Sequence, residues 1–446
     1  MGTHGLSNAF HSGPPGSRDE SALLRKTNLR ITGVDTLVVG CPPVSPTMPD
    51  GEFLATPLDY CGENWRDGGG PAGLRGGSVY AVLVRVKTDE GLEGVGSVGV
   101  GNGSAVYIIN QHLKHIVLNQ NPFDVELLWE KMYRSTLNYG RKGVVLEAIS
   151  AVDIALWDLR GKLSNQPVYN LLGGRTKPQI RVYASRLYAH KNLDMLARQA
   201  NGFRKQGFTA MKQRFGYGPS DGNVGISKNL ELVKVVRDAV GPDIDLMADA
   251  YMGWDVPYAI RMISILEDAG MNLKWVEEPV IPDDIDGYAR IRRSVRTPIS
   301  GGEHEFTRYG FRELIKKEAL DILQPDVNRV GGITEAQKIW ALASANNLQV
   351  IPHAGQLHNY HLVVSHLNSP IAEYFPPPNE GGTLDDDTLF WELFEGEPRA
   401  VEGFITLSEE PGLGLKINEK TVRRWQLQGD SDMLTSNLAN LVRGGV

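Results

Sequence analysis

The chain has 446 residues, of which 41% are hydrophobic and 22% charged, and its formal net charge is −7. This composition is ordinary for a globular enzyme, and the length allows two or three domains with a large core. The acidic balance provides no basic patch for nucleic acid or an anionic membrane, and no run of about 18 apolar residues predicts a transmembrane helix. We therefore expect a cytoplasmic protein that binds a small molecule, with neither nucleic acid nor a membrane as partner.

Cysteine content and the first residues say little about function. Cys41 and Cys61 are the two cysteines, too few for a disulfide framework in a chain of this size, and we interpret them as reduced thiols. The start of the chain is rich in Gly, Ser and Pro and lacks the apolar run of a signal peptide. We expect a disordered tail over residues 1–28.

The next part of the chain shows strand patterns and then helix patterns, which predict a separate α+β domain over residues 29–151. Residues 41–77 form a loop of unusual length that is crowded with Gly and Pro, typical of a mobile lid. The predicted strands cover residues 29–39, 78–87 and 91–98, and the predicted helices cover residues 105–118, 124–135 and 143–163.

A strand–helix repeat then predicts a barrel over residues 152–375. Short apolar runs end in an acid or a histidine every 23 to 28 residues, and each interval holds a helical pattern such as residues 256–271 or 333–346. That spacing is the period of a βα unit, and more than five units in a row favour a (β/α) barrel. Its first two strands are expected at residues 179–185 and 209–215, its seventh helix at 357–367 and its last strand at 371–375.

The remaining residues, 376–446, begin with a Gly-, Pro- and Asp-rich stretch that predicts a linker leaving the barrel. We expect the chain to return there to the first domain, with an edge strand at residues 413–417.

Three acids at successive strand ends, Asp249, Glu277 and Glu303, are expected to meet at the mouth of this barrel. Each one alone could be a salt bridge or a helix cap. Together they cannot all ionise cheaply without a cation, and a set of oxygen ligands suits Mg²⁺, whereas zinc would need more His or Cys. Glu278 should point the other way along its strand, and we expect it to pair with a lysine or arginine of the barrel.

His353 stands one predicted strand after Asp326. A carboxylate beside an imidazole fixes the tautomer and raises the pKa, which makes the histidine a better base. The alternative is a histidine buried in the core. His358 and His361 follow in the next predicted helix and are expected on a helix face.

Two cations and one further acid complete the predicted site. Lys212 and Arg214 share one face of a strand; the lysine is a base only if its neighbours depress its pKa, and the arginine stays protonated. Glu373 in the last strand could donate a hydrogen bond to an oxyanion if burial keeps it protonated. His304 follows Glu303, so strand alternation would point it away from the mouth.

With these residues in place, the chain resembles the enolase superfamily in its mandelate racemase subgroup, from about residue 29 to residue 420. The resemblance implies a modified (β/α)₇β TIM-type barrel with an α+β capping domain, which the N-terminal region and the C-terminal segment form together. It also implies a homo-oligomer. The shared motifs are Ala-Met-Lys-Gln-Arg, Met-Ala-Asp, Val-Glu-Glu-Pro, Gly-Gly-Glu-His, Gln-Pro-Asp-Val, Gly-Gly-Ile-Thr and Ile-Pro-His.

Within the subgroup, residues 55–57, 216–222, 272–275 and 369–373 are similar to acid-sugar dehydratases that act on L-rhamnonate. This implies a hydro-lyase that converts a six-carbon sugar acid, L-rhamnonate, into 2-keto-3-deoxy-L-rhamnonate and water. The implied roles are as follows: Asp249, Glu277 and Glu303 bind one Mg²⁺ per subunit, His353 with Asp326 is the acid/base, Lys212 withdraws charge and Glu373 stabilises the intermediate.

The substrate-binding residues are expected mainly in the capping loop. The family's substrate-binding arginine is expected at Arg75 or, failing that, at Arg66, with Arg214 and His304 as further candidates. Known bacterial members also use a histidine from this loop, and residues 41–77 contain none. The residues that would take its place are Asp59, Asn64 or Trp65.

Four other functions stay open. The chain could dehydrate another aldonate or aldarate, or it could be a racemase or epimerase of a 2-hydroxy acid, which needs a base on each face of the α-carbon. It could be a non-catalytic barrel, although such a protein has no physical need for converging acids. A metal-dependent hydrolase would normally use more histidine ligands.

Overall fold

The structure, a computed structural model, describes residues 28–40, 51–61, 80–100, 103–377 and 389–426. Most of the predicted tail, much of the predicted lid and most of the predicted linker therefore lie outside the described residues. The same holds for Cys41, Asn64, Trp65, Arg66 and Arg75.

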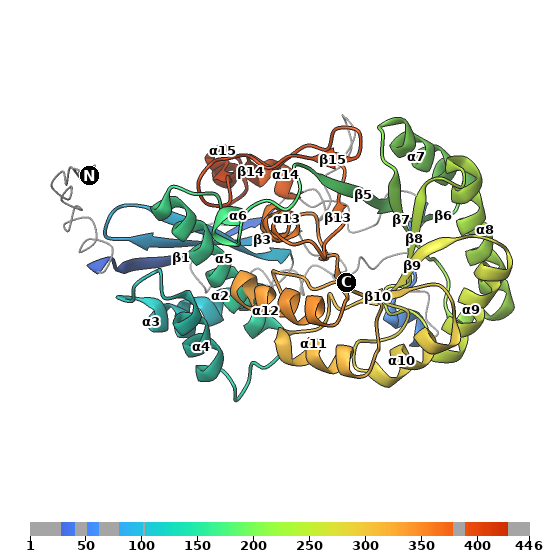
Figure 1. Ribbon diagram of the computed structural model, residues 1–446, viewed down its shortest axis with the longest axis horizontal. Helices are drawn as coiled ribbons and strands as arrows, with labels where there is room; N and C mark the ends of the chain where they lie inside the picture. The colour runs from blue at the N-terminus through green and yellow to red at the C-terminus, as the bar shows by residue number, and fades with distance from the viewer. Residues whose placement is uncertain (1–27, 41–50, 62–79, 101–102, 378–388, 427–446) are drawn as a thin grey trace, which may run out of the picture.

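A three-stranded antiparallel sheet, in the order β1-β3-β4, and the helices beside it form one end of the molecule (Figure 1). The long helix α5 (Val144–Ser164) lies directly on this sheet, because β4 presents glycine to it. A Cβ at Gly96 would lie 2.1 Å from the Ala151 carbonyl oxygen. The other elements here are β1 (Ile31–Gly40), β3 (Tyr80–Thr88), β4 (Glu93–Val100), α2 (Ser104–Ile108), α3 (Lys114–Val117), α4 (Val125–Ser135) and α6 (Val168–Leu171).

The expected strands and helices of this end are confirmed, with one difference. The predicted helix over residues 105–118 contains a π-helical turn, Ile109–Leu113, between α2 and α3. The long helix α5 runs without a break through residues 151 and 152, where the sequence suggested a domain boundary.

Parallel strands form the barrel, in the order β12-β11-β10-β9-β8-β7-β5-β13, and helices surround them (Figure 1). The predicted TIM-type barrel with a cap is confirmed. Its strands are β5 (Ile180–Leu187), β7 (Ala210–Arg214), β8 (Asp245–Asp249), β9 (Leu273–Glu277), β10 (Ile299–Gly301), β11 (Ile322–Leu323), β12 (Gln349–Val350) and β13 (Ala372–Tyr374). Its helices are α7 (Leu193–Lys205), α8 (Gly222–Val240), α9 (Val256–Asp268), α10 (Ile285–Ser294), α11 (Thr307–Lys316), α12 (Gly332–Ala345) and α13 (Leu357–Ser365).

One layer of apolar side chains fills the inside of the barrel and sets the register of the mouth. Because alternate residues of a strand face the same side, the residue two positions further along also points inward. Met247 is followed in this way by Asp249, and Trp275 by Glu277. The layer consists of Tyr183, Ala210, Met247, Trp275, Ile322, Ile351 and Ile371.

The C-terminal segment contacts both parts of the molecule. A bridge between Val39 and Gln426 and an ion pair between Arg85 and Glu419 (2.5 Å) join it to the three-stranded sheet. Its strand β15 (Phe404–Ile405) pairs with β5 of the barrel. Its other elements are α14 (Leu389–Leu393), the pair β14 (Phe394–Glu395) and β16 (Lys416–Ile417), and α15 (Glu419–Trp425). Two short strands also pair, β2 (Glu52–Phe53) and β6 (Ala189–His190).

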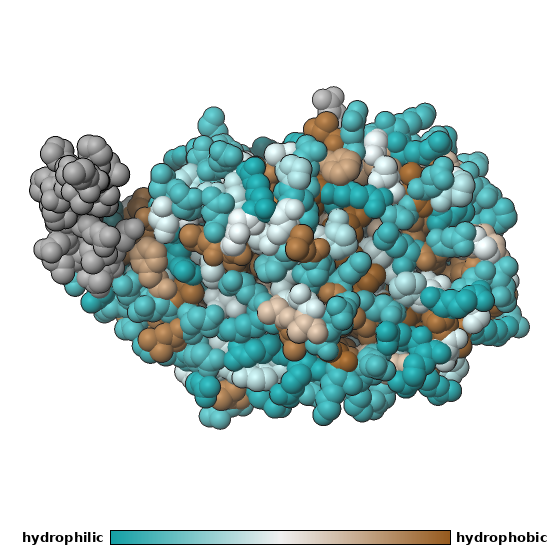
Figure 2. Space-filling model, viewed as in Figure 1, coloured by the Kyte–Doolittle hydropathy of each residue, from teal (hydrophilic) through white to brown (hydrophobic). Residues whose placement is uncertain are grey.

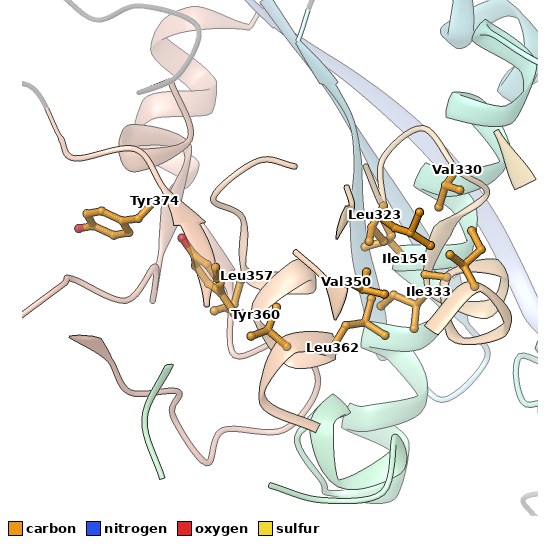
Figure 3. Packing of buried hydrophobic residues seen from close by; sticks show 14 of the residues in the cluster. Ile154, Leu323, Val330, Ile333, Val350, Leu357, Tyr360, Leu362 and Tyr374 are labelled. Atoms are coloured by element: carbon orange, nitrogen blue, oxygen red, sulfur yellow. The ribbon is translucent and has the colours of Figure 1, made fainter. Parts of the chain in front are cut away.

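A continuous apolar core runs from α5 into the barrel. Figure 3 shows Ile154 of α5 beside Leu323 and Ile333, so the helix that lies on the sheet also packs against the barrel. The face seen in Figure 2 is mainly hydrophilic, with hydrophobic residues scattered over it. Within the described ranges, no helix combines the length and apolar character needed to cross a membrane.

His361 of α13 is expected to make folding sensitive to acid. Its Nδ1 accepts a hydrogen bond from Tyr169 N–H (3.0 Å) and its Nε2 donates to Leu413 O (3.1 Å), so the ring must be neutral. Burial lowers its pKa to about 4. The neutral ring contributes about 3 kcal/mol to the free energy of unfolding. This contribution is fully present above the unfolded pKa of about 6.5 and is lost as the pH falls towards 4.

Urea unfolding at pH 8 and pH 5 tests this expectation. His361→Phe should lower the free energy of unfolding at pH 8 by about 2–4 kcal/mol, since two buried backbone groups lose their partners. It should also reduce the loss between pH 8 and pH 5. The exposed His115→Gln is the control. An unchanged pH dependence in His361→Phe would contradict the assignment.

Candidate active site

Lys212 of β7 lies at the centre of the barrel mouth and contacts three acids. Its Nζ forms an ion pair with Glu277, lies 2.9 Å from Glu373 Oε1 and lies 3.8 Å from Asp249 Oδ2. Burial lowers the pKa of this lysine, but Glu277 and Glu373 reverse the effect and hold it well above its usual value. Lys212 is therefore a cation. The condition for it to be a base, a pKa depressed by its neighbours, is not met.

Asp249 and Glu277 end β8 and β9, and Glu303 stands just after β10, so the three predicted acids lie at the same end of neighbouring strands. Burial and the neighbouring charge of Glu303 raise the pKa of Asp249. Burial and Asp249 likewise raise the pKa of Glu277 to about 7, against the opposing effect of Lys212. Trp275 Nε1 and Gln324 Nε2 donate to Glu277 Oε2 (3.1 and 2.8 Å). A set of buried carboxylates that repel one another fits a hard divalent cation.

His353 and Asp326 form the predicted dyad. His353 Nδ1 lies 2.8 Å from Asp326 Oδ2, and His353 Nε2 faces the acids, 3.4 Å from Glu303 Oε2. Burial lowers the pKa of His353, but Glu303 and Asp326 outweigh it and raise the pKa to about 9. The Asp326 contact leaves Nε2 as the ring nitrogen that can exchange a proton at the mouth.

Glu373 stands at the seam of the barrel, where β12 and β13 end the path of paired strands. Its Oε2 accepts a hydrogen bond from Ala354 N–H (2.8 Å), the residue after His353. Burial raises the pKa of Glu373, but Lys212 and His353 lower it below its usual value. The condition that burial keeps this acid protonated is not met here, because two cations lie beside it.

The two expectations for Glu278 and His304 are wrong. Among the described residues, Glu278 pairs with His304 and not with a lysine or arginine; both of its oxygens lie 2.9 Å from His304 Nδ1. His304 does not point away from the acids either, since its Nε2 lies 3.6 Å from Glu303 Oε1. Strand alternation fails here because β10 ends at Gly301 and Gly302 has φ +116°. The ligand atoms of Glu278, Glu303 and His304 all lie within 4.8 Å of one another.

The remaining predicted residues divide into two groups. Arg214 is buried, with its guanidinium 4.3 Å from the centre of the Tyr188 ring and 3.8 Å from Asp249 Oδ2. Asp59 is also buried, and its Oδ2 accepts from Thr56 N–H (2.9 Å), as in a capped turn. The loop residues Asn64, Trp65, Arg66 and Arg75 lie outside the described residues.

Three residues of the mouth escaped the sequence analysis. Gln324 follows Ile322 of the inner layer by two positions, so the inward register could have identified it. Tyr251 has φ +43° and its ring lies edge-on to His304, 5.8 Å away. Arg329 contacts both Glu303 and Asp326. Tyr251 and Arg329 lie outside the strands, where no sequence period indicates direction.

Known proteins are similar to this chain in sequence and in fold. Residues 76–173 match the N-terminal domain model of mandelate racemase / muconate lactonizing enzyme, and residues 195–421 match the enolase C-terminal domain-like model. An L-rhamnonate dehydratase from Saccharopolyspora erythraea is 40% identical over 345 residues, 77% of this chain and 84% of that protein.

Solved structures agree with these relatives. The crystal structure of L-rhamnonate dehydratase from Gibberella zeae has a TM-score of 0.77 and 34% identity, and covers 89% of this chain and 96% of its own. A racemase from Streptomyces coelicolor with bound magnesium has a TM-score of 0.75 and 27% identity, over 89% of this chain and all (100%) of its own. The chain therefore belongs to the mandelate racemase/muconate lactonizing enzyme family of the enolase superfamily and is an enzyme of the hydro-lyase class, a dehydratase.

Proposed function

We propose that this enzyme is a Mg²⁺-dependent dehydratase of a six-carbon sugar acid, with L-rhamnonate as substrate and 2-keto-3-deoxy-L-rhamnonate and water as products. The observation that carries the proposal is that three buried acids lie at the same end of neighbouring strands, beside a histidine–aspartate dyad whose Nε2 faces one of them. Two L-rhamnonate dehydratases among its relatives support the substrate. A structure of the Gibberella zeae enzyme complexed with Mg supports the metal.

Asp249, Glu277 and Glu303 would hold the ion. When bound, Mg²⁺ would withdraw charge from the substrate carboxylate and so make the C2 proton more acidic. The Lys212 ammonium lies 3.8 Å from Asp249 Oδ2 and 2.9 Å from Glu373 Oε1, so it adds a second positive charge beside the proposed metal ligands.

His353 performs the proton transfers. Its Nε2 takes the C2 proton, and the electron pair of the C2–H bond passes into the ene-diolate form of the substrate. Asp326 holds Nδ1 and stabilises the imidazolium that results. The same Nε2 then returns the proton to the 3-hydroxyl, the C3–O bond breaks and water leaves. The resulting enol becomes the 2-keto-3-deoxy acid by losing the proton of its 2-hydroxyl and gaining a proton from solvent at C3. Because one histidine serves both steps, the proton and the hydroxyl leave from the same face.

The structure weighs against a racemase, which needs a second base opposite His353. Lys212 has a pKa well above its usual value, and arginine at position 214 stays protonated. Both residues are expected to be charged at neutral pH, which makes them poor bases for a carbon proton.

A panel of sugar acids with Mg²⁺ tests the proposal by end-point detection of 2-keto-3-deoxy acids, with proton NMR of the C2 position in D₂O. L-rhamnonate, or a close stereochemical relative, should be converted and should give a product with one solvent deuterium at C3. Exchange or inversion at C2 without loss of water would instead favour a racemase or epimerase. No reaction with any acid sugar would overturn the proposal.

A further inference from the structure

Arg329 joins the two halves of the proposed catalytic centre. It lies in the loop after β11, where its own N–H and that of Val330 donate to Asp326 O (2.9 and 2.8 Å) and form one turn of chain. From this turn the side chain contacts two acids, one that follows β10 and one that follows β11. Its Nε lies 3.3 Å from Asp326 Oδ2, and its Nη1 donates to the main-chain oxygen and to Oε1 of Glu303, both at 3.2 Å.

Both carboxylates that Arg329 contacts also face His353. Asp326 Oδ2 is also the oxygen that forms the hydrogen bond with His353 Nδ1. Glu303 Oε2 lies 3.4 Å from His353 Nε2. A planar guanidinium can hold two acids at a fixed separation and orientation, whereas the ammonium of a lysine is a point charge on a flexible stem. Arg329 is thus placed to fix the distance between one proposed metal ligand and the dyad.

We propose that Arg329 is a positioning residue that keeps Glu303 and the Asp326–His353 dyad in one rigid unit, so that the cation site and the proton-transfer site stay in register. This inference rests on the proposed function, because it assigns Glu303 to the ion and His353 to the proton. It concerns the geometry of the two acids, not the charge of the arginine.

The chain offers a matched control at the opposite end of the same strand. Arg292 of α10 contacts Asp321, just before β11, with Nε 2.7 Å from Oδ1, and its Nη1 donates to Glu318 O (3.2 Å). The two arginine side chains are similarly exposed, 30% for Arg292 and 29% for Arg329. Each arginine thus contacts a carboxylate and a backbone carbonyl, but Arg292 lies away from the mouth.

The test compares Arg329→Met, Arg329→Lys and Arg292→Met by Mg²⁺ titration calorimetry and by steady-state kinetics at saturating Mg²⁺. Positioning predicts that both Arg329 variants bind Mg²⁺ about 10-fold or more weakly and lose kcat, with a much smaller change in KM. A role through charge alone predicts the opposite pattern: tighter Mg²⁺ binding in Arg329→Met and unchanged binding in Arg329→Lys.

Two results would overturn the inference: wild-type Mg²⁺ affinity and kcat in Arg329→Lys, or effects of Arg329→Met no larger than those of Arg292→Met. The calorimetry needs no substrate, so it separates this inference from the substrate assignment. If the unaltered enzyme binds Mg²⁺ but converts no sugar acid, the proposed function fails while the Mg²⁺ affinities still report on Arg329. If the unaltered enzyme binds no Mg²⁺, both fail.

Discussion

His353→Asn is expected to lower kcat for dehydration by about 10³–10⁴-fold, the range that positioned acid–base catalysis usually contributes. The replacement removes Nε2, the atom that faces Glu303, while its side-chain amide can still donate to Asp326 in place of Nδ1. Mg²⁺ binding should change far less than kcat, because the three proposed metal ligands are retained. Kinetics at saturating substrate and Mg²⁺ measure the effect.

The pH profile provides a second readout of the same residue. Glu303 and Asp326 raise the pKa of His353 to about 9, and a base must be neutral to accept a proton. Turnover of the unaltered enzyme should therefore rise with pH and level off at or below about pH 9, since an ion at Glu303 would lower this pKa. His353→Asn should lack this dependence. The control is His366→Asn at the end of α13; equal losses in both variants would argue against His353 as the acid/base.

The inward register is the part of the site that the sequence predicts best. Once a strand is placed, alternation assigns its side chains, so Lys212, Asp249 and Glu277 follow directly from the apolar residues two positions earlier. Three more sequence predictions lie just beyond or inside short strands: Asp326 and His353 follow β11 and β12, and Glu373 lies in β13. Asp326 and His353 each stand three positions beyond the last residue of their strand, so they remain close to the strand end.

Two kinds of feature could not be predicted from the sequence: the direction of side chains in loops, and the ionisation state of acids that depends on neighbouring charges. His304 turns towards Glu303 because Gly302 leaves the strand conformation, and no alternation rule covers that turn. Arg329 reaches two acids through a loop of no regular period. The ionised state of Glu373 depends on its distance from Lys212, 2.9 Å, which only a folded structure supplies.

Removing divalent cations with a chelator is expected to abolish turnover and to lower the melting temperature by several degrees, and Mg²⁺ should restore both. An ion present at about 100 times its dissociation constant stabilises the folded state by about 2.7 kcal/mol. The site has a specific reason to need it: burial and mutual repulsion raise the pKa values of Asp249 and Glu277, so the acids are costly to keep ionised together.

Glu277→Gln identifies where this stabilisation arises. The variant removes one of the three charged ligands, so it should lose the Mg²⁺-dependent rise in melting temperature together with turnover. Glu335→Gln is the matched control, because Glu335 of α12 is a fully buried acid that pairs with Arg308 of α11, outside the mouth. That control should lose some stability yet keep the full response to Mg²⁺. A Mg²⁺-dependent shift that persists in Glu277→Gln would place the ion elsewhere, and the cluster of Glu278, Glu303 and His304 would then be the first alternative to examine.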